Sequence, residues 1–300
     1  MTEGSHCRLC GGAVVPSFRK TLLHKYDVTF LKCGHCLSLQ TETPYWLEEA
    51  YADDRPLTDC GMVTRTLDLA MKMDLVLSIL GVGSAPPCID TGGSLGLFSR
   101  MMRDRGYNFF RSDPYSRNFY VPFHDAEENK LTSAAVVTAF EVMEHLSNPK
   151  LELNRLFLLS PDVFVASTEV YRDQTPDWWY YAPDIGQHVF FYSPSALQAI
   201  AECYQMHLIS NGTLHLFCRR SPQFLNYGPH ELLNLKQVFD NGQRFYLESL
   251  QLFGSKLVDP YRWVNKDYVD ILGQIRAKDN GAAKIAEGFL RSRQISPTTV

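Results

Sequence analysis

The sequence predicts an α/β fold built on a seven-stranded, mostly parallel sheet that ends in an antiparallel hairpin. Between residues 87 and 222, short apolar stretches alternate with stretches of helical periodicity, and a glycine-rich turn follows the first apolar stretch. Asn211-Gly212, a strong two-residue hairpin signal, joins the last two apolar stretches. Such alternation is typical of a parallel sheet with helices on both faces. We expect this core to follow a cysteine-rich module at 1–43 and a helical connector at 44–86, and to precede a helical extension at 223–300.

The elements of the core are predicted one by one. Runs of apolar and β-branched residues are typical of buried strands, and serine or asparagine before a proline marks the start of a helix. We expect strands at 88–90, 108–113, 120–123, 134–140, 162–168, 205–210 and 214–219, and helices at 97–105, 146–159 and 193–204. Apolar residues at 3.6-residue spacing also predict a helix from about 60 to 80.

The composition excludes several classes of function. The chain has 300 residues, 45% of them hydrophobic, and a formal net charge of −4. This charge does not favour binding governed by phosphates, so we expect no nucleic acid or anionic membrane as partner. No apolar run approaches the roughly 18 residues that span a bilayer, and the N-terminus lacks the pattern of a secretory signal. We therefore expect a cytoplasmic protein.

Four of the eight cysteines form two C-x-x-C pairs, Cys7 with Cys10 and Cys33 with Cys36. Two residues between cysteines let a tight turn aim both sulfurs at one ion, and 22 residues separate the pairs. Unliganded thiols or a redox pair are the alternatives, but two pairs in a segment too small for its own core favour a metal. We therefore predict a structural zinc ribbon at 1–43 with these four thiolates as ligands.

The turn from Asp90 to Gly96 is the predicted ligand site of the main domain. Glycines let a ligand lie against the backbone, and the N-terminus of the next helix presents free N–H groups. In an open α/β sheet, small molecules bind beyond the carboxyl ends of the strands. The turn does not match the dinucleotide pattern G-x-G-x-x-G, which disfavours a dehydrogenase or an epimerase.

The pattern Asp90-x-Gly92-Gly93-x-x-Gly96 resembles the first motif of class I S-adenosylmethionine-dependent methyltransferases, in which Ser94 stands at the place of the middle glycine. The segment Phe140-Glu141-Val142-Met143-Glu144-His145 is similar to the F-x-V-x-E-H segment of that family. The resemblance covers roughly residues 60–220 and implies a Rossmann-like methyltransferase sheet. It implies S-adenosylmethionine as cofactor, bound by Asp90, Gly92, Gly93, Gly96, Asp113, Asp125 and Phe140, with Asp113 accepting the ribose hydroxyls.

The segment 171–192 is predicted to face the methyl acceptor, because it is long, aromatic and follows a strand at the carboxyl edge of the sheet. A buried aromatic core is the alternative. The placement of His188 is similar to a subgroup of zinc-ribbon methyltransferases that includes sugar-nucleotide C-methyltransferases, although Gln187 replaces the glutamate of that group. An imidazole can remove a proton near neutral pH. We predict His188 as the base, with His145 second, and O- or C-methylation of a sugar-like small molecule.

Two other functions stay open at this point. The chain could be a binding or scaffold protein that keeps the fold without turnover, or a methyltransferase acting on RNA or protein. The helical extension is expected either to cover the acceptor cleft or to form the surface of a homodimer. Neither the acceptor nor the oligomeric state can be read from the residues.

Overall fold

The computed structural model describes residues 6–52 and 61–220, the short strands 225–227 and 231–233, and seven single residues between 266 and 277. Most of the predicted helical extension at 223–300 therefore lies outside the described residues. Near the start of that segment the structure has strands where a helix was predicted, whereas the described residues between 266 and 277 are helical, as predicted. β11 (Leu225–Tyr227) and β12 (Glu231–Leu233) form an antiparallel pair.

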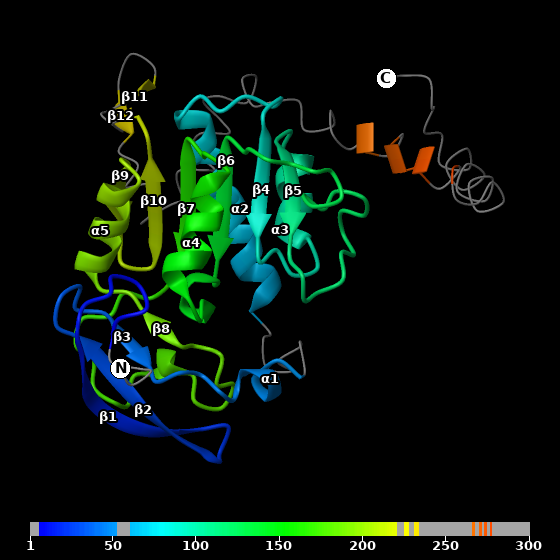
Figure 1. Ribbon diagram of the computed structural model, residues 1–300. Helices are drawn as coiled ribbons and strands as arrows, with labels where there is room; N and C mark the ends of the chain where they lie inside the picture. The colour runs from blue at the N-terminus through cyan, green and yellow to red at the C-terminus, as the bar shows by residue number, and fades with distance from the viewer. Residues whose placement is uncertain are drawn as a thin grey trace.

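The centre of the fold is a six-stranded sheet in the order β5-β4-β6-β7-β10-β9 (Figure 1). The first four strands are parallel, and β10 runs antiparallel to both β7 and β9. The strands are β4 (Pro87–Thr91), β5 (Asn108–Ser112), β6 (Val136–Phe140), β7 (Val163–Ser167), β9 (His207–Ser210) and β10 (Leu214–Cys218). The predicted mixed sheet with a terminal hairpin at Asn211-Gly212 is confirmed.

Helices cover both faces of this sheet. They are α2 (Met62–Ile79), α3 (Leu97–Asp104), α4 (Pro149–Leu158) and α5 (Pro194–Cys203). One buried cluster joins α2 and α3 to Val136, Val163 and Val165, and a second joins α4 and α5 to Val137, Phe164 and Ala166. Because neighbouring strand residues point to opposite faces, the apolar runs fill both cores. The helix predicted at about 60–80 is formed as α2.

The strand predicted at 120–123 is not formed, so the seven-stranded prediction is wrong for this segment. Residues 120–123 form a bend and turn, and a single parallel bridge joins Arg111 to Asp125. Pro122 has no N–H to donate to a neighbouring strand, and Phe123 adopts φ +66°. Both features prevent the extended run that β-ladder pairing requires.

The N-terminal module forms a second sheet at the carboxyl end of the parallel strands (Figure 1). It comprises β1 (Val14–Leu22), β2 (Tyr26–Cys33), β3 (Leu39–Thr41) and β8 (Phe190–Phe191) in that order. The strand β8 comes from the long segment between β7 and α5, and it pairs antiparallel with β3. A short helix, α1 (Leu47–Ala50), follows. The predicted acceptor segment is thus part of the N-terminal sheet.

One described residue of the C-terminal part packs against the main domain. Asp267 is buried against α3, where its carboxylate accepts hydrogen bonds from Arg100 and Arg103. Among the described helices, none combines the length and the apolar character needed to cross a bilayer.

Candidate active site and metal centre

A pocket of about 210 Å³ lies over the glycine-rich turn at the carboxyl end of β4. Of the residues predicted to bind the cofactor, Asp90, Gly92, Gly93 and Phe140 line it. The opposite wall comes from α2, with Met62, Arg65, Thr66 and Leu69. Gly96, Asp113 and Asp125 are not among the lining residues. The sequence did not indicate the role of α2, because its apolar periodicity predicts packing against the sheet and leaves its first turn unassigned.

Three residues of the turn have a left-handed backbone, Gly92, Ser94 and Gly96, and Ser94 is the one that is not glycine. Gly92 has φ +65°, and a Cβ there would lie 2.5 Å from Cγ2 of Val142, so no other residue fits. Ser94 has φ +46°. The position where the sequence departs from the family pattern therefore keeps a conformation that favours glycine, and a serine adopts it at a cost of about 1 kcal/mol.

Asp113 holds the turn from the neighbouring strand. Its Oδ2 accepts a hydrogen bond from the Ser94 N–H at 2.9 Å, and its Oδ1 accepts from the N–H groups of Tyr115 and Ser116. The carboxylate thus lies beside the pocket and already binds backbone donors. A ribose diol would have to share these oxygens or displace the loop N–H.

Arg111 is a contributor that the sequence analysis missed. Its buried guanidinium donates to the carbonyls of Ser94 and Ser116, and it forms an ion pair of 2.6 Å with Asp125. These contacts tie the glycine-rich turn to the segment after β5. Asp125, predicted to bind the cofactor, is therefore engaged by Arg111 and by Asn118 at 3.0 Å. An arginine directly after two phenylalanines, in a predicted strand, was the available signal.

Asp90 lies beneath the turn and is only 3% exposed. Its carboxylate accepts hydrogen bonds from the hydroxyls of Thr138 at 2.8 Å and Ser99 at 3.3 Å. Burial raises the pKa of Asp90 to about 7, and these two hydroxyls oppose the shift. Asp90 therefore supports the turn from below and holds the start of α3 through Ser99.

The end of β6 leads from the pocket to a group of titratable side chains. Phe140 and Glu141 line the pocket, and Glu141 has φ +52°, a strained conformation for a residue with a side chain. Its carboxylate accepts a hydrogen bond of 2.6 Å from the Ser167 hydroxyl. One 3-10 turn, Met143–His145, then follows. This turn places Glu144 and His145 just beyond the pocket wall.

Glu144, His145 and His188 form one cluster, in which one potential ligand atom from each lies within 4.8 Å of the others. The two imidazole rings meet edge to face with centroids 4.8 Å apart. Glu144 is fully buried, and His145 keeps 19% of its side chain exposed. The structure therefore brings together the two predicted catalytic histidines. Glu144 was recognised only as part of a motif and not as a site residue.

The hydrogen bonds of the two histidines define which nitrogens stay available. Nδ1 of His188 lies 2.7 Å from the Tyr180 carbonyl, which can only accept, so Nδ1 carries the proton and Nε2 keeps its lone pair. Nδ1 of His145 contacts the Tyr51 hydroxyl at 3.1 Å, and its Nε2 lies 3.9 Å from Glu144. Burial and the neighbouring His188 lower the pKa of His145 to about 3, whereas burial raises the pKa of Glu144.

The segment carrying His188 is fixed by the N-terminal module. The Trp46 indole donates to the Gly186 carbonyl at 2.7 Å, and the Gln187 amide donates to the Ala50 carbonyl at 2.7 Å. A glutamate at 187 could not make this bond when ionised, which explains the amide there. The Val189 N–H donates to the Glu144 carbonyl at 2.8 Å. His188 is thereby held against the turn that carries Glu144 and His145.

Most aromatic side chains of the segment 171–192 are packed into a core rather than exposed to a ligand. Tyr171, Tyr180 and Tyr181 are buried against the N-terminal sheet and Trp46. Trp179 is the exception, with 70% of its surface exposed. The segment therefore forms a packed wall in this structure.

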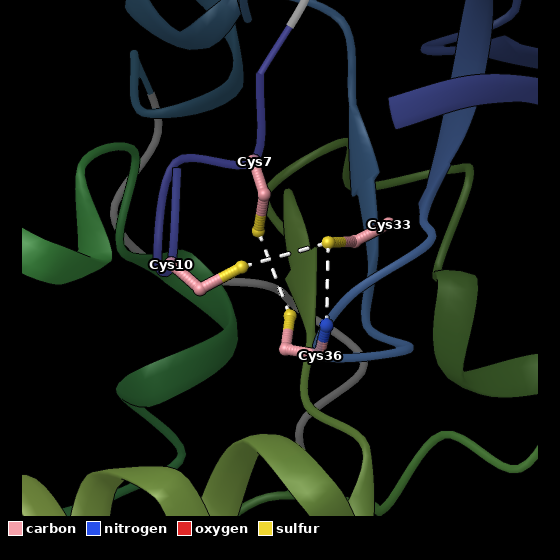
Figure 2. A group of neighbouring side chains, drawn as sticks. All are labelled: Cys7, Cys10, Cys33 and Cys36. Atoms are coloured by element: carbon pink, nitrogen blue, oxygen red, sulfur yellow. Dashed lines mark hydrogen bonds between the residues drawn. The ribbon is translucent and has the colours of Figure 1, made fainter. Parts of the chain in front are cut away.

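The four predicted cysteine ligands converge at the edge of the N-terminal sheet (Figure 2). The Sγ atoms of Cys7 and Cys36 lie 3.7 Å apart, and those of Cys10 and Cys33 lie 3.5 Å apart. These separations are too long for disulfides. They match the spacing of about 3.8 Å expected for four sulfurs at 2.3 Å around a tetrahedral ion. The donor set and its geometry therefore fit zinc.

The family comparison identifies the class of the main domain. Residues 68–211, just under half of the chain, match a family model described as "Methyltransferase domain". This segment runs from α2 through the pocket and the histidine cluster to the end of β9. The match agrees with the methyltransferase class predicted from the sequence. A comparison with curated proteins found no relative.

Solved methyltransferase structures are similar to the chain at low identity. One is the 1,6-didemethyltoxoflavin N1-methyltransferase of Burkholderia thailandensis, with 11% identity, a TM-score of 0.41, and coverage of 67% of this chain and 97% of that one. Another is the magnesium protoporphyrin IX methyltransferase of Synechocystis PCC 6803, with 12% identity, a TM-score of 0.39, and coverage of 57% and 90%.

Proposed function

We propose that the protein transfers a methyl group from S-adenosylmethionine to a hydroxyl or carbon of a small molecule of the sugar or sugar-nucleotide type, with a histidine acting on the acceptor. The observation that carries this proposal is one continuous stretch of chain. Phe140 and Glu141 line the pocket over the glycine-rich turn, and Glu144 and His145 follow within one turn and meet His188. A donor in the pocket would therefore lie next to groups that can bind or deprotonate an acceptor.

The chemistry requires little more than this juxtaposition. The sulfonium of S-adenosylmethionine already carries the leaving group, so the enzyme must align the acceptor with the methyl carbon and take up its proton. His188 Nε2 keeps a lone pair for that purpose, while the lowered pKa of His145 makes that residue a weaker base. Gln187 replaces the glutamate that precedes the histidine in the related subgroup. In this chain the carboxylate near His188 comes instead from Glu144, after the end of β6.

The pocket is proposed to hold the cofactor through Gly92, Gly93 and Phe140, with Asp113 facing the ribose and Asp90 supporting the turn. The first turn of α2 closes the pocket and supplies Arg65, which no sequence motif indicated. The four-cysteine cluster is proposed to hold one structural zinc ion. This ion would fix the module that positions His188.

Calorimetry with S-adenosylmethionine and S-adenosylhomocysteine tests the cofactor assignment. We expect micromolar binding of both, with the demethylated product bound more tightly, as in a working enzyme. The Gly92→Ala variant should lose at least about tenfold in affinity, because its Cβ would meet Val142. Gly81→Ala is the matched control, since Gly81 also has a positive φ of +68° but nothing within 4 Å of the added Cβ. Equal binding by the wild type and Gly92→Ala would contradict the assignment.

Thermal shift of the cofactor-bound protein with a panel of sugar nucleotides, glycosides and small phenols tests the acceptor class. Turnover of the best acceptor by His188→Ala then tests the histidine. We expect a loss of at least about a hundredfold at saturating acceptor. Normal turnover would end the assignment of His188. Stabilisation by RNA that weakens with salt would instead favour a nucleic-acid acceptor.

A further inference from the structure

The carboxylate of Glu144 is buried without a partner. Its side chain has no exposed surface, and neither of its oxygens accepts a hydrogen bond from a described residue. The nearest basic nitrogen, Nε2 of His145, is 3.9 Å away, beyond hydrogen-bond range. The hydroxyls of Tyr180 and Thr168, which pair with each other at 3.1 Å, lie near the carboxylate and oppose the rise of its pKa, but neither forms a well-aligned hydrogen bond with it. An ionised carboxylate buried without a hydrogen bond costs several kcal/mol, so it either takes up a proton or is paired with a positive charge, which a bound cation would supply.

The two histidines beside Glu144 have the arrangement of metal ligands. The Tyr180 carbonyl fixes the Nδ1 proton of His188 and leaves Nε2 as its ligand atom. The Tyr51 hydroxyl contacts Nδ1 of His145, so Nε2 faces Glu144. Outer contacts of this kind orient the imidazoles in metal sites and define their tautomers.

The distances allow one ion to bridge the three side chains. Around an ion with bonds of about 2.1 Å, neighbouring ligand atoms lie about 3.0 to 3.4 Å apart. The distance between Glu144 and His145 is 3.9 Å, and all three ligand atoms lie within 4.8 Å of one another. These distances are longer than the ligand spacing, and small side-chain rotations would shorten them to it. His145 is partly exposed, so the cluster has an open side.

We propose that Glu144, His145 and His188 bind one divalent first-row transition metal ion, with open coordination positions for an oxygen of the methyl acceptor. Two imidazoles and one carboxylate suit manganese, iron, cobalt, nickel or zinc, whereas magnesium and calcium take oxygen ligands. Three protein ligands leave positions free, as catalytic sites require, in contrast to a closed set of four.

The use of this ion in the reaction rests on the proposed methyl transfer, but its binding does not. An acceptor hydroxyl on the ion would lose its proton to water, because a bound cation lowers the pKa of that hydroxyl. The oxygen electron pair then forms a bond to the methyl carbon as the carbon–sulfur bond breaks. The bonding pair stays on sulfur and leaves a neutral thioether. His188 would then act as a ligand, and the direct base of the preceding section would not be needed.

Titration with Mn²⁺ followed by electron paramagnetic resonance tests the ion. Mn²⁺ prefers nitrogen and oxygen ligands, and zinc would compete with it at the proposed site, so the titration uses full-length protein that carries one zinc per chain, held by the four cysteines. We expect one Mn²⁺ per chain to bind and broaden the free six-line signal. The variants Glu144→Gln and His188→Gln should each bind at least about a hundredfold more weakly, since each lacks a direct ligand.

Two further sets of variants keep the result interpretable. Tyr51→Phe removes only the hydroxyl on His145, and we expect a loss of about tenfold. Glu202→Gln and His207→Ala change exposed residues of α5 and β9 and should bind Mn²⁺ like the wild type. Thermal melting and zinc content report whether each variant is folded. If Glu144→Gln or His188→Gln does not fold, Mn²⁺ binding by Tyr51→Phe still tests the metal site.

The outcomes separate this proposal from the methyl transfer itself. No Mn²⁺ bound at millimolar concentration, or equal binding by wild type and all three site variants, would overturn the metal site. Calorimetric binding of S-adenosylmethionine is read independently in the same samples. Full turnover in the presence of a chelator, with the ion shown to be removed, would restrict the ion to a role outside the reaction and leave His188 as the base.

Discussion

The chain contains two clusters of side chains that could bind a metal, and they differ in their donor atoms, their number of ligands and their exposure. The four-cysteine cluster has sulfur donors only, a complete set of four, and thiols that converge at the edge of one small sheet. The cluster of Glu144, His145 and His188 has nitrogen and oxygen donors, three members and an exposed side. The first set suits an ion that holds structure, and the second suits an ion or a proton that takes part in chemistry.

The two clusters are also connected. Arg8, between the first two cysteines, donates to the Val189 carbonyl, one residue after His188. The Ser193 hydroxyl donates to the Cys36 carbonyl, and β3 pairs with β8. The structural cluster therefore fixes the backbone on which one member of the reactive cluster lies. The comparison shows that the N-terminal module supports the segment that carries His188, and so the proposed active site.

The largest expected effect comes from breaking the four-cysteine cluster. Cys33→Ser removes one thiolate, and we expect loss of bound zinc and of about 4 kcal/mol or more of stability, because the small sheet has little core of its own. Turnover should fall with it as His188 is released. Metal analysis and thermal melting measure both. Cys203→Ser, at an exposed cysteine of α5, is the matched control. Retention of zinc and of the wild-type melting temperature in Cys33→Ser would refute the structural role.

The two clusters also differ in how far the sequence predicts them. The cysteine pairs are local, and a C-x-x-C spacing dictates which atoms converge, so the ligand set could be predicted in full. Glu144 and His188 are 44 residues apart and meet only because β8 joins a sheet that begins at Val14. No local pattern contains that pairing. Motif resemblance indicated both histidines, but it could not reveal an unpartnered carboxylate between them.

The same distinction holds for the fold. β6 and β7 were predicted because continuous apolar runs are typical of buried parallel strands, and the hairpin was predicted from Asn211-Gly212. The bend at 120–123 was missed because its apolar residues outweighed Pro122 in the prediction. Arg111 and the first turn of α2 were missed as site residues, since their roles depend on what lies across the sheet edge.

A chelator should separate the two clusters. Because the second cluster has three ligands and an open side, we expect EDTA to remove its ion first and to leave the fold intact. An ion held at about 100 times its Kd contributes about 2.7 kcal/mol, so the melting temperature should fall by roughly 5–10 °C. Zinc should remain bound at that stage. Loss of zinc before the second ion, or unfolding together with the first loss, would reverse the proposed order.

A third buried histidine shows how such a residue behaves without a ligand. His215 has both nitrogens hydrogen-bonded, Nδ1 to the Ser210 hydroxyl and Nε2 to the Thr168 carbonyl. Burial lowers its pKa from 6.5 to about 4. The unfolded chain therefore binds a proton more readily, and stability is lost as pH falls from 6.5 toward 4. At pH 5 this loss is about 2 kcal/mol.

The His215→Asn variant should remove that dependence. Denaturant melts at pH 7 and pH 5 should differ by about 2 kcal/mol less in the variant than in the wild type. Mn²⁺ binding by the folded variant should stay unchanged, because His215 belongs to neither cluster. The exposed His207→Asn should keep the wild-type difference between the two pH values. An unchanged pH difference in His215→Asn would mean that His215 is already able to take up a proton in the folded protein.

The smallest expected effect comes from Ser94→Gly, which tests whether a change in the glycine-rich turn leaves both clusters unaffected. Ser94→Gly relieves a left-handed backbone at φ +46° but adds freedom to the unfolded chain, so we expect a net gain of about 0.5 kcal/mol. Cofactor affinity should be retained, since the contact with Asp113 comes from the backbone N–H of residue 94. Denaturant melts, calorimetry and metal content measure these three quantities. A loss of stability, or a change in the content of either metal, would show that the Ser94 side chain has a role that its backbone conformation does not explain.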